Sequence, residues 1–210
     1  MSKPVANRDV FINCPFDPEF LDIFRAIVFA VRACGFTPKT AQDENDGAKV
    51  RIDKIQALIK ECDWGIHDLS AVKLDGKTKM PRFNMPLELG IAMGAKRFGG
   101  TRQRIKRLLI LEEEAHRYDQ STSDISGQDI DVHHRKPAEA IRAVRNWFAD
   151  NRAESDSIPP GGDALVLDYA KVRNHIDHVV GARRLDPWAK MTHADYLYCL
   201  DAALLILAES

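Results

Sequence analysis

A chain of 210 residues can bury one hydrophobic core and carry a small appendage. Because its net charge is only −1 and 29% of its residues are charged, no overall field favours nucleic acid or an anionic membrane. No stretch approaches about 18 consecutive apolar residues, and no signal-peptide core begins the chain. The four cysteines are scattered along the sequence. We therefore expect a cytoplasmic protein without membrane or direct nucleic-acid partners.

The first two thirds of the chain alternates short apolar runs with segments of helical period. Strands are predicted at 9–16, 36–41, 63–70 and 107–111 and near Val132, and helices after Asp17 as far as Gly35, over 49–62, from Asn84 and from Pro137. The stretch 112–131 is polar and irregular, with the length of a functional loop. Strands that alternate with helices predict a three-layer α/β fold around a parallel sheet, and right-handed crossovers favour a flavodoxin-like strand order.

The last third begins with a run rich in Ser, Pro and Gly over 153–163, which is typical of a linker. After it, apolar residues at helical spacing from Leu165 predict one helix, and a Thr192–Asp195 capping box predicts the start of a second. The sequence therefore predicts an α/β domain over 1–152 and a C-terminal helical hairpin over 164–210. Two helices bury little surface alone, so the hairpin is expected to dock on the α/β core or to pair with another copy of the chain.

The most informative stretch is 82–94, which reads Arg-Phe-Asn-Met-Pro-Leu-Glu-Leu-Gly-Ile-Ala-Met-Gly. Asn84 as the N-cap and Pro86 in the first turn predict a helix start, which places Glu88 just inside the helix. The small residues that follow let this helix pack closely on its neighbours. A carboxylate near a helix N-terminus gains about 0.3–1 kcal/mol from the helix dipole without any catalytic role, so Glu88 has both a structural and a catalytic interpretation.

Several familiar catalytic motifs are absent from the sequence. It contains no G-x-G-x-x-G dinucleotide fingerprint, no G-x-x-x-x-G-K-[ST] phosphate loop, no H-E-x-x-H and no G-x-S-x-G. His67 and the pair His133–His134 have no Cys or carboxylate at ligand spacing, so neither a metal site nor a cofactor is predicted. The first strand ends at Asn13 without an acidic pair, which argues against phosphotransfer through an aspartate.

Eight side chains are expected to line one cleft, because the carboxyl ends of parallel strands meet at the same edge of a sheet. They are Asn13, Phe16, Asp17, Asp68, Ser70, Arg82, Asn84 and Glu88. An aromatic ring for a base, carboxylate and amide groups for ribose hydroxyls and a guanidinium for phosphate suit a nucleoside or nucleotide. Structural interpretations stay open beside this one: Asp68 as the cap of a turn, Phe16 as a core residue, Arg82 as a solvated charge and Asn84 as an N-cap.

Three stretches of the sequence carry a resemblance to a known family. They are Val-Phe-Ile-Asn-Cys-Pro-Phe at 10–16, Cys-Asp-Trp-Gly-Ile-His-Asp-Leu-Ser at 62–70 and Arg-Phe-Asn-Met-Pro-Leu-Glu-Leu-Gly at 82–90. Over about residues 9–150 the chain resembles bacterial TIR-like proteins, which are close in fold to the nucleoside 2-deoxyribosyltransferases. The resemblance implies a flavodoxin-like fold, Glu88 as the catalytic glutamate and cleavage of an N-glycosidic bond. It also implies a role in bacterial defence and a homo-oligomer formed through the C-terminal hairpin.

Cleavage of a ribosyl C1′–N bond passes through an oxocarbenium-like state, which a positioned carboxylate can stabilise. The leading prediction is an NAD glycohydrolase that releases nicotinamide and ADP-ribose or its cyclic form, with NAD as substrate rather than cofactor. The second is a nucleoside or deoxynucleotide 2-deoxyribosyltransferase or hydrolase, in which the departing base needs a proton donor such as Asp68. The third is a nucleotide-sensing or adaptor module that performs no chemistry.

Overall fold

The computed structural model describes residues 7–43, 46–70, 83–117, 123–125 and 127–208. Its contacts divide the chain into two compact units, one made of Met1–Pro15 with Gly35–Arg135 and the other of Phe16–Cys34 with Lys136–Ser210. Each unit is therefore built from two stretches that lie apart along the chain. The division into 1–152 and 164–210 stays a prediction.

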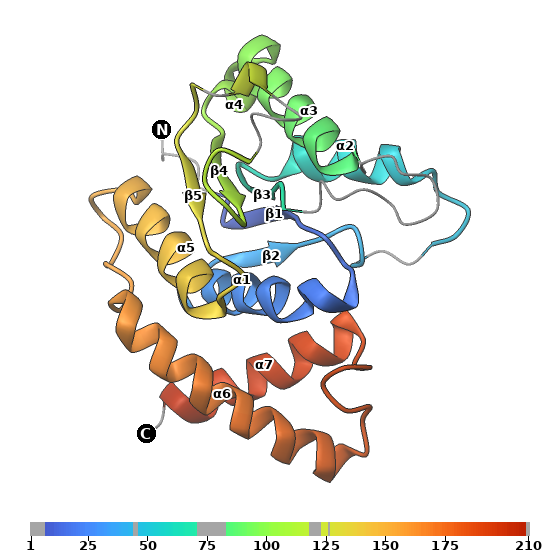
Figure 1. Ribbon diagram of the computed structural model, residues 1–210, viewed down its shortest axis with the longest axis vertical. Helices are drawn as coiled ribbons and strands as arrows, with labels where there is room; N and C mark the ends of the chain where they lie inside the picture. Colours follow the sequence, from blue (N-terminus) through green and yellow to red (C-terminus); the bar gives the residue numbers. More distant parts are fainter. Residues whose placement is uncertain (1–6, 44–45, 71–82, 118–122, 126, 209–210) are drawn as a thin grey trace, which may run out of the picture. The chain divides into compact units, whose positions relative to one another are not determined.

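The first unit contains a five-stranded sheet in which every neighbouring pair of strands is parallel (Figure 1). The strands are β1 (Asp9–Asn13), β2 (Thr37–Lys39), β3 (Trp64–Asp68), β4 (Arg107–Glu112) and β5 (Ile130–Val132), in the order β2-β1-β3-β4-β5. The same unit contains α2 (Arg51–Glu61), α3 (Asn84–Phe98), α4 (Thr101–Arg104) and the short 3₁₀ helix η3 (Ser123–Ile125). The predicted α/β class with a parallel sheet is confirmed, and it is consistent with a three-layer α/β fold.

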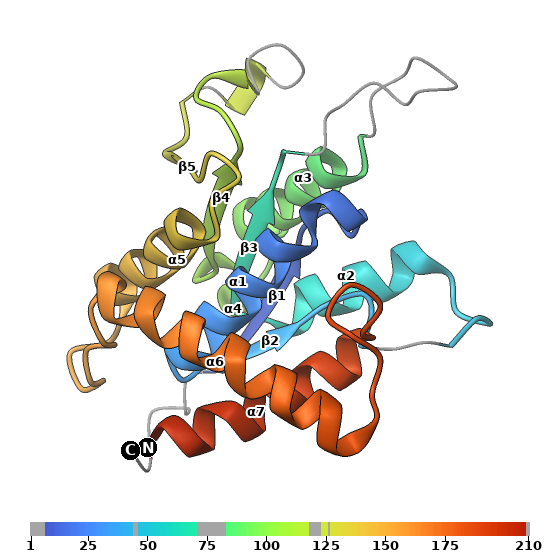
Figure 2. The same cartoon turned by 60° about the horizontal axis from the view of Figure 1, so that its bottom comes forward.

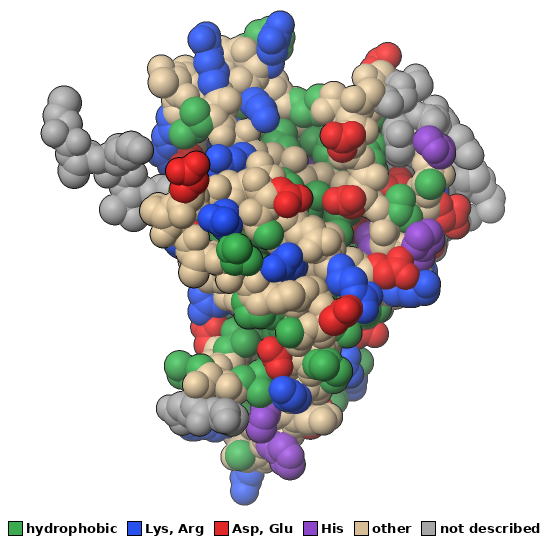
Figure 3. Space-filling view, turned by 90° about the vertical axis from the view of Figure 1, so that its left-hand side faces the viewer, with side chains coloured by type: hydrophobic (Ala, Val, Ile, Leu, Met, Phe, Trp, Pro, Cys, Tyr) green, Lys and Arg blue, Asp and Glu red, His purple; other side chains and the backbone are tan. Residues whose placement is uncertain are grey.

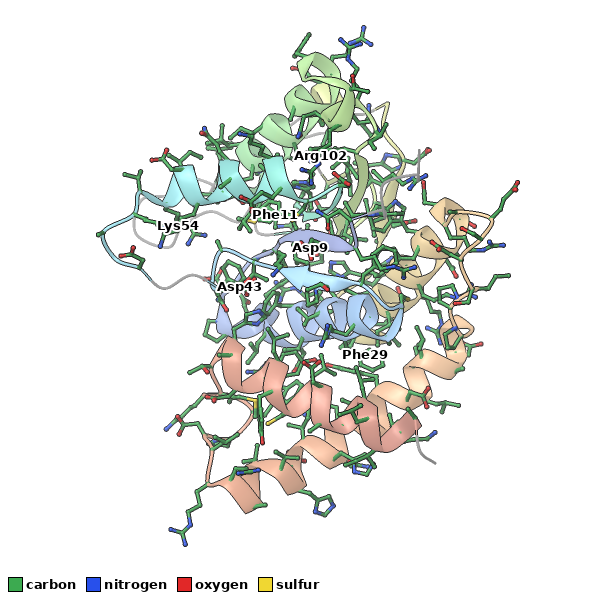
Figure 4. All side chains as sticks on the ribbon, turned by 180° about the vertical axis from the view of Figure 1, so that it is seen from behind. Asp9, Phe11, Phe29, Asp43, Lys54 and Arg102 are labelled. Atoms are coloured by element: carbon green, nitrogen blue, oxygen red, sulfur yellow. The ribbon has the colours of Figure 1, made fainter. Side chains whose placement is uncertain are left out.

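Apolar stripes on α2 and α3 pack against this sheet. Phe11 of β1 lies between its strand and α2 (Figure 4), where it packs with Ile55 and Ile59. Leu89 of α3 packs with Ile110 of β4 in a second cluster. Burial of each such side chain contributes about 1.5–3 kcal/mol, so packing fixes α3 on the sheet and sets the position of every residue that it carries.

The second unit is built from helices, within the described residues. They are η1 (Pro18–Phe20), α1 (Leu21–Ala33), α5 (Pro137–Asn151), α6 (Gly162–Arg183) and α7 (His193–Ala208). Helices α6 and α7 lie side by side (Figure 2), and α1 contacts both α5 and α6. The predicted capping box is confirmed: the Thr192 hydroxyl donates to Asp195 Oδ2 at 2.7 Å and accepts from the Asp195 backbone N–H at 3.1 Å.

A buried arginine ties α1 to the segment that joins α6 and α7. Arg25 is 2% exposed, and its guanidinium donates to the carbonyl oxygens of Trp188 at 2.5 Å and Met191 at 2.9 Å. The guanidinium also lies 4.3 Å from the centroid of the Trp188 ring, and the Tyr196 hydroxyl donates to the Arg25 carbonyl at 2.8 Å. Burial lowers the pKa of Arg25 from its usual value. Charge-assisted bonds and the ring contact offset that desolvation, so this arginine organises the second unit.

The structure corrects two local predictions. Asn84 is the first residue of α3 rather than its N-cap, because Phe83 occupies the N-cap position and makes no side-chain capping bond. Pro86 still lies in the first turn, so the predicted helix start is right to within one residue. Helix α4 is absent from the predicted elements, because four residues show no hydrophobic period. Within the described ranges, none of the helices combines the length and the apolar character that crossing a bilayer requires.

Candidate functional site

Polar side chains gather where the parallel strands of the first unit end. Asn13 ends β1, Asp68 ends β3, Glu112 ends β4 and His133 follows β5. All four side chains are buried, with at most 2% of their surface exposed. Open parallel sheets bind ligands at the carboxyl ends of their strands, so this edge is the candidate site.

We call Asn13, His67 and Glu88 the α3-side group, because Asn13 bonds to His67 and to Met85 on α3, and Glu88 follows Met85 by about one turn of that helix. Asn13 and His67 are register partners on β1 and β3, so their side chains share one face of the sheet. Asn13 Nδ2 donates to the carbonyl oxygen of Met85 on α3 at 3.1 Å and lies 3.1 Å from His67 Nδ1. The amide nitrogen has two hydrogens, and both are used by these two bonds. Asn13 therefore joins both strands to the first turn of α3.

Two polar atoms of the α3-side group have no hydrogen-bond partner among the described residues, Asn13 Oδ1 and His67 Nε2. Because His67 Nδ1 accepts the Asn13 bond, the proton of the neutral ring is on Nε2. Burial lowers the pKa of His67 from its usual 6.5 to about 3, so the ring stays neutral at physiological pH. Leaving a buried donor or acceptor unpaired costs about 1–3 kcal/mol, which indicates that a water molecule or a ligand pairs with these atoms.

Glu88 lies on the buried stripe of α3. Met85, Glu88, Leu89 and Ala92 are the buried residues of this helix, and their spacing of three and four residues puts them on one face. The Glu88 side chain is 5% exposed. Burial raises the pKa of its carboxyl from 4.5 to about 7, and the charge of Arg51 on α2 opposes that rise only in part. A carboxyl that exchanges its proton near neutral pH suits acid–base or nucleophilic chemistry.

Asp68, Ser70 and His133 form the other part of the site, the Asp68 network. Strand alternation turns Asp68 to the opposite face from its neighbour His67. Asp68 Oδ1 accepts from the backbone N–H of Ser70 at 2.9 Å, and Asp68 Oδ2 lies 3.1 Å from His133 Nε2. The Ser70 hydroxyl oxygen lies 3.1 Å from the same His133 nitrogen. The polar side-chain atoms of this network are thus bonded to one another.

The Asp68 network contains the residue types of a Ser-His-Asp triad but not its geometry. His133 Nδ1 accepts from the backbone N–H of Arg135 at 3.0 Å, so the proton of the neutral ring is on Nε2. That nitrogen donates to Asp68 and faces the Ser70 hydroxyl, and it has no lone pair with which to take the serine proton. His134 and Arg135 both have left-handed backbone, with φ of 47° and 56°, and this costly turn directs the Arg135 N–H to the ring. The network therefore lacks the geometry that nucleophilic catalysis by Ser70 requires.

Glu112 adds a buried carboxyl at the end of β4. Its Oε1 accepts from the backbone N–H of Glu113 at 2.8 Å, and its side chain is 1% exposed. Burial raises its pKa, and the nearby charge of Asp68 acts in the same direction. The carboxyl edge of the sheet thus holds three buried acids, at Asp68, Glu88 and Glu112.

The remaining predicted site residues lie elsewhere in the chain or outside the described residues. Phe16 and Asp17 belong to the second unit, where the Phe16 ring packs edge-on against Phe24 at 5.2 Å between centroids and Asp17 is the N-cap of η1. Asn84 is exposed at the start of α3. Arg82 lies outside the described residues. The structure therefore joins Asn13 to α3 and Asp68 to Ser70, and the binding roles of all eight residues stay predictions.

Sequence reasoning assigned no role to His67, Glu112 or His133. The signal that could have found them is a polar residue within or just after a run that otherwise has the apolar pattern of a buried parallel strand. His67 interrupts Trp64–Asp68, Glu112 follows Leu-Leu-Ile-Leu, and His133 follows a short strand. Polar residues in that position have to be hydrogen-bonded in the interior.

Comparison with known proteins adds no assignment to this site. No family model matches the chain, and neither a curated protein nor a solved structure matches it. Within the described residues, no group of three or more His, Cys, Asp and Glu side chains is placed to hold a metal ion. Function is therefore inferred from the geometry and electrostatics of the site.

Proposed function

We propose that this protein cleaves an N-glycosidic bond with Glu88 as the catalytic carboxylate, and that its substrate is NAD. The observation that carries the proposal is the burial of Glu88 on the sheet-facing stripe of α3, one turn after Met85, with a pKa of about 7. A carboxylate fixed on a packed helix cannot turn away from a developing positive charge, and low polarity around it strengthens the attraction. The unpaired acceptor Asn13 Oδ1 is suited to a ribose hydroxyl.

The proposed reaction breaks the bond between ribose C1′ and the nicotinamide nitrogen. The bonding electron pair leaves with nicotinamide, which departs neutral and needs no proton. Ionised Glu88 stabilises the oxocarbenium ion that remains. A water molecule then adds its oxygen to C1′ and loses one proton to solvent, which yields ADP-ribose; attack by an adenine nitrogen of the same molecule yields the cyclic form. Fixed charge of this kind contributes about two to three decades in rate.

The remaining parts of the proposal follow from the resemblance of the sequence to bacterial TIR-like proteins. The strand order 2-1-3-4-5 is the flavodoxin-like order, which supports a flavodoxin-like, TIR-like fold. The pair α6 and α7 is proposed as a C-terminal hairpin that joins copies of the chain. In its favour, α7 exposes Tyr198 and Leu205 although its opposite face is buried. Asp68, Ser70, Arg82 and Asn84 are the proposed further substrate contacts, and the buried free cysteines suit a reducing cytoplasm.

The first test follows free base by chromatography after incubation of the purified protein, at low and high concentration, with NAD and separately with deoxynucleosides. The proposal expects nicotinamide release that Glu88→Gln lowers at least 100-fold. Glu61→Gln is the matched control, because Glu61 is an exposed glutamate of the same unit, at the end of α2. Nicotinamide release that rises faster than linearly with protein concentration would support activity in a homo-oligomer. Equal activity of Glu88→Gln and wild type would refute the proposal.

Deoxyribosyl transfer is the second candidate, and the same pKa favours it. A carboxyl that is about half protonated at pH 7 can donate a proton to a departing purine or pyrimidine. The two reactions then differ in their pH profiles. NAD cleavage by ionised Glu88 rises with pH and levels off above about 7, whereas base release assisted by protonated Glu88 falls above about 7. Binding of NAD without release of any base would instead support a nucleotide-sensing module.

A further inference from the structure

A groove of about 740 Å³ lies in the first unit and is separate from the α3-side group and the Asp68 network, since its described lining includes none of their residues. Its walls come from the C-terminal half of α3, from α4, from the middle of β4 and from two residues that precede β5. Its volume falls within the range of about 300–1,000 Å³ that is usual for small-molecule sites. The proposed glycosidase does not use this groove.

The floor of the groove is apolar and belongs to the core. Leu108 and Ile110 project from the same face of β4, two residues apart, and Met93 comes from α3. Met93 and Ile110 also pack with Leu89 in a core cluster. Helix α4 spans only about 6 Å, which is too short to cover this part of the strand. The floor is therefore an apolar surface, with one adaptable methionine side chain, that suits the apolar face of a ring.

The rim of the groove is basic. Lys96 and Arg97 come from the last turn of α3, and Arg104 comes from α4. Figure 3, in which this end of α3 and α4 is at the top of the view, shows Lys and Arg side chains gathered there. Among the described residues no carboxylate forms an ion pair with these three side chains, whereas the neighbouring Arg102, outside the groove, is paired with Asp63 at 3.1 Å. Arg104 Nε donates to the Gly99 carbonyl oxygen at 3.1 Å, and its other guanidinium nitrogens remain for an anionic ligand, as do the charges of Lys96 and Arg97.

The charge of the groove matches a phosphate dianion. Asp129 is the carboxylate that the described lining contains, so with Lys96, Arg97 and Arg104 the net charge is +2. The C-terminal end of the α3 dipole offsets only about half a unit of that charge. A phosphate monoester carries about −1.5 to −2 at neutral pH. One such group balances the net charge of the groove, and Gln128 and Asp129 can accept bonds from sugar hydroxyls or a base amino group.

We propose that this groove binds a nucleoside monophosphate. The phosphate lies between Arg97, Arg104 and Lys96, and the base lies on the floor formed by Met93, Leu108 and Ile110. Guanidinium groups bind phosphate oxygens in pairs, which suits two arginines on neighbouring helices. The site is independent of Glu88 and of the proposed cleavage.

The test is isothermal titration calorimetry of the full-length protein with adenosine monophosphate, adenosine and inorganic phosphate, each alone. The expected Kd for adenosine monophosphate is at least tenfold lower than for either fragment, because the groove takes both the base and the phosphate. The double variant R97Q/R104Q raises that Kd at least tenfold. Both arginines are exposed, and the substitutions remove one exposed hydrogen bond, from Arg104 to the Gly99 carbonyl, so we expect an intact fold, which circular dichroism verifies.

Two single variants serve as controls for the location of the bound nucleotide. Arg102→Gln removes a neighbouring cation that does not line the groove, and it leaves the Kd within twofold. Glu88→Gln also leaves the Kd within twofold, which separates this groove from the proposed active site. The proposal is overturned if adenosine monophosphate does not bind, if inorganic phosphate binds equally well, if R97Q/R104Q binds as wild type does, or if Arg102→Gln or Glu88→Gln weakens binding as much as the double variant.

Discussion

Two neighbouring residues at the end of β3 belong to groups with opposite hydrogen-bond states. His67 belongs to the α3-side group, where Asn13 Oδ1 and His67 Nε2 have no partner among the described residues and Glu88 has a pKa of about 7. Asp68 belongs to a network whose side chains are bonded to one another and to backbone N–H groups. One residue step along a strand thus separates a group with two unpartnered polar atoms from one in which every side chain has a hydrogen-bond partner.

This difference in hydrogen bonding suggests that the Asp68 network has a structural role and the α3-side group a functional one. A buried network whose side chains bond to one another rigidifies the fold and contributes to stability, whereas buried polar atoms without a protein partner are suited to bind water or a ligand. Changes in the Asp68 network are therefore expected to lower the free energy of unfolding. The α3-side group is expected to control pH dependence and turnover.

The largest expected effect concerns acid stability and His67. Because the pKa of His67 is about 3 in the folded protein and 6.5 usually, the unfolded chain binds a proton below about pH 6.5 and the folded chain does not. The contribution of His67 to the free energy of unfolding is therefore complete above pH 6.5 and falls as the pH drops towards 3, by up to about 5 kcal/mol. Urea unfolding across this range measures this contribution as the pH-dependent difference between wild type and His67→Gln, which the exposed control His178→Gln should not show. If the free energy of unfolding depends on pH in the same way in His67→Gln and in wild type, groups other than His67 cause that dependence.

Next in size is the loss of the His133 ring. His133→Ala leaves Asp68 Oδ2 and the Ser70 hydroxyl without their shared partner in a fully buried position. The free energy of unfolding should fall by about 4 kcal/mol, since the variant loses a bond to a buried carboxylate and gains a cavity. Equilibrium urea unfolding measures this, with the exposed His178→Ala expected within about 0.5 kcal/mol of wild type. A His133→Ala protein that is stable but inactive would show that the Asp68 network acts in the function of the protein rather than in its stability.

Glu88 gives a somewhat smaller effect, of opposite pH direction. Its folded pKa of about 7 lies above the usual 4.5, so the unfolded chain releases this proton first, and the contribution of Glu88 to stability falls as the pH rises from about 4.5 to 7. Glu88→Gln does not ionise and should be more stable than wild type by up to about 3 kcal/mol above pH 7, with no such gain below pH 4.5. Thermal and urea unfolding at pH 4 and pH 8 test this, and equal gains at both would mean that the carboxyl is not desolvated.

The smallest of the four effects belongs to Asn13→Ala. It removes the two bonds to Met85 O and His67 Nδ1, and should lower the free energy of unfolding by about 2 kcal/mol. If Asn13 Oδ1 binds a ribose hydroxyl, the KM for NAD rises more than kcat falls. Asn174→Ala, at an exposed position of α6, is the control for both measurements. A fall in kcat with unchanged KM would argue against a binding role for this amide.

The order of strands and helices could be predicted from short-range pattern. Apolar runs of strand length, helical spacing and start signals such as Pro137 and Thr192 depend on residues a few positions apart. The same local information put Glu88 in the first turns of α3. The N-cap was misplaced by one residue because the side chain of Asn84 suits that position whether or not the backbone uses it.

What the sequence by itself determined is therefore the alternation of strand and helix, the parallel sheet that follows from it, and the presence of a carboxylate near the start of α3. Only the tertiary structure decided that Glu88 is buried with a pKa of about 7, that His133 meets Asp68 from 65 residues away, and that each unit joins two distant stretches. The physical reason is the distance along the chain over which the relevant interactions act. Local conformation depends on neighbours along the chain, whereas desolvation and buried hydrogen bonding depend on which distant segments packing brings together.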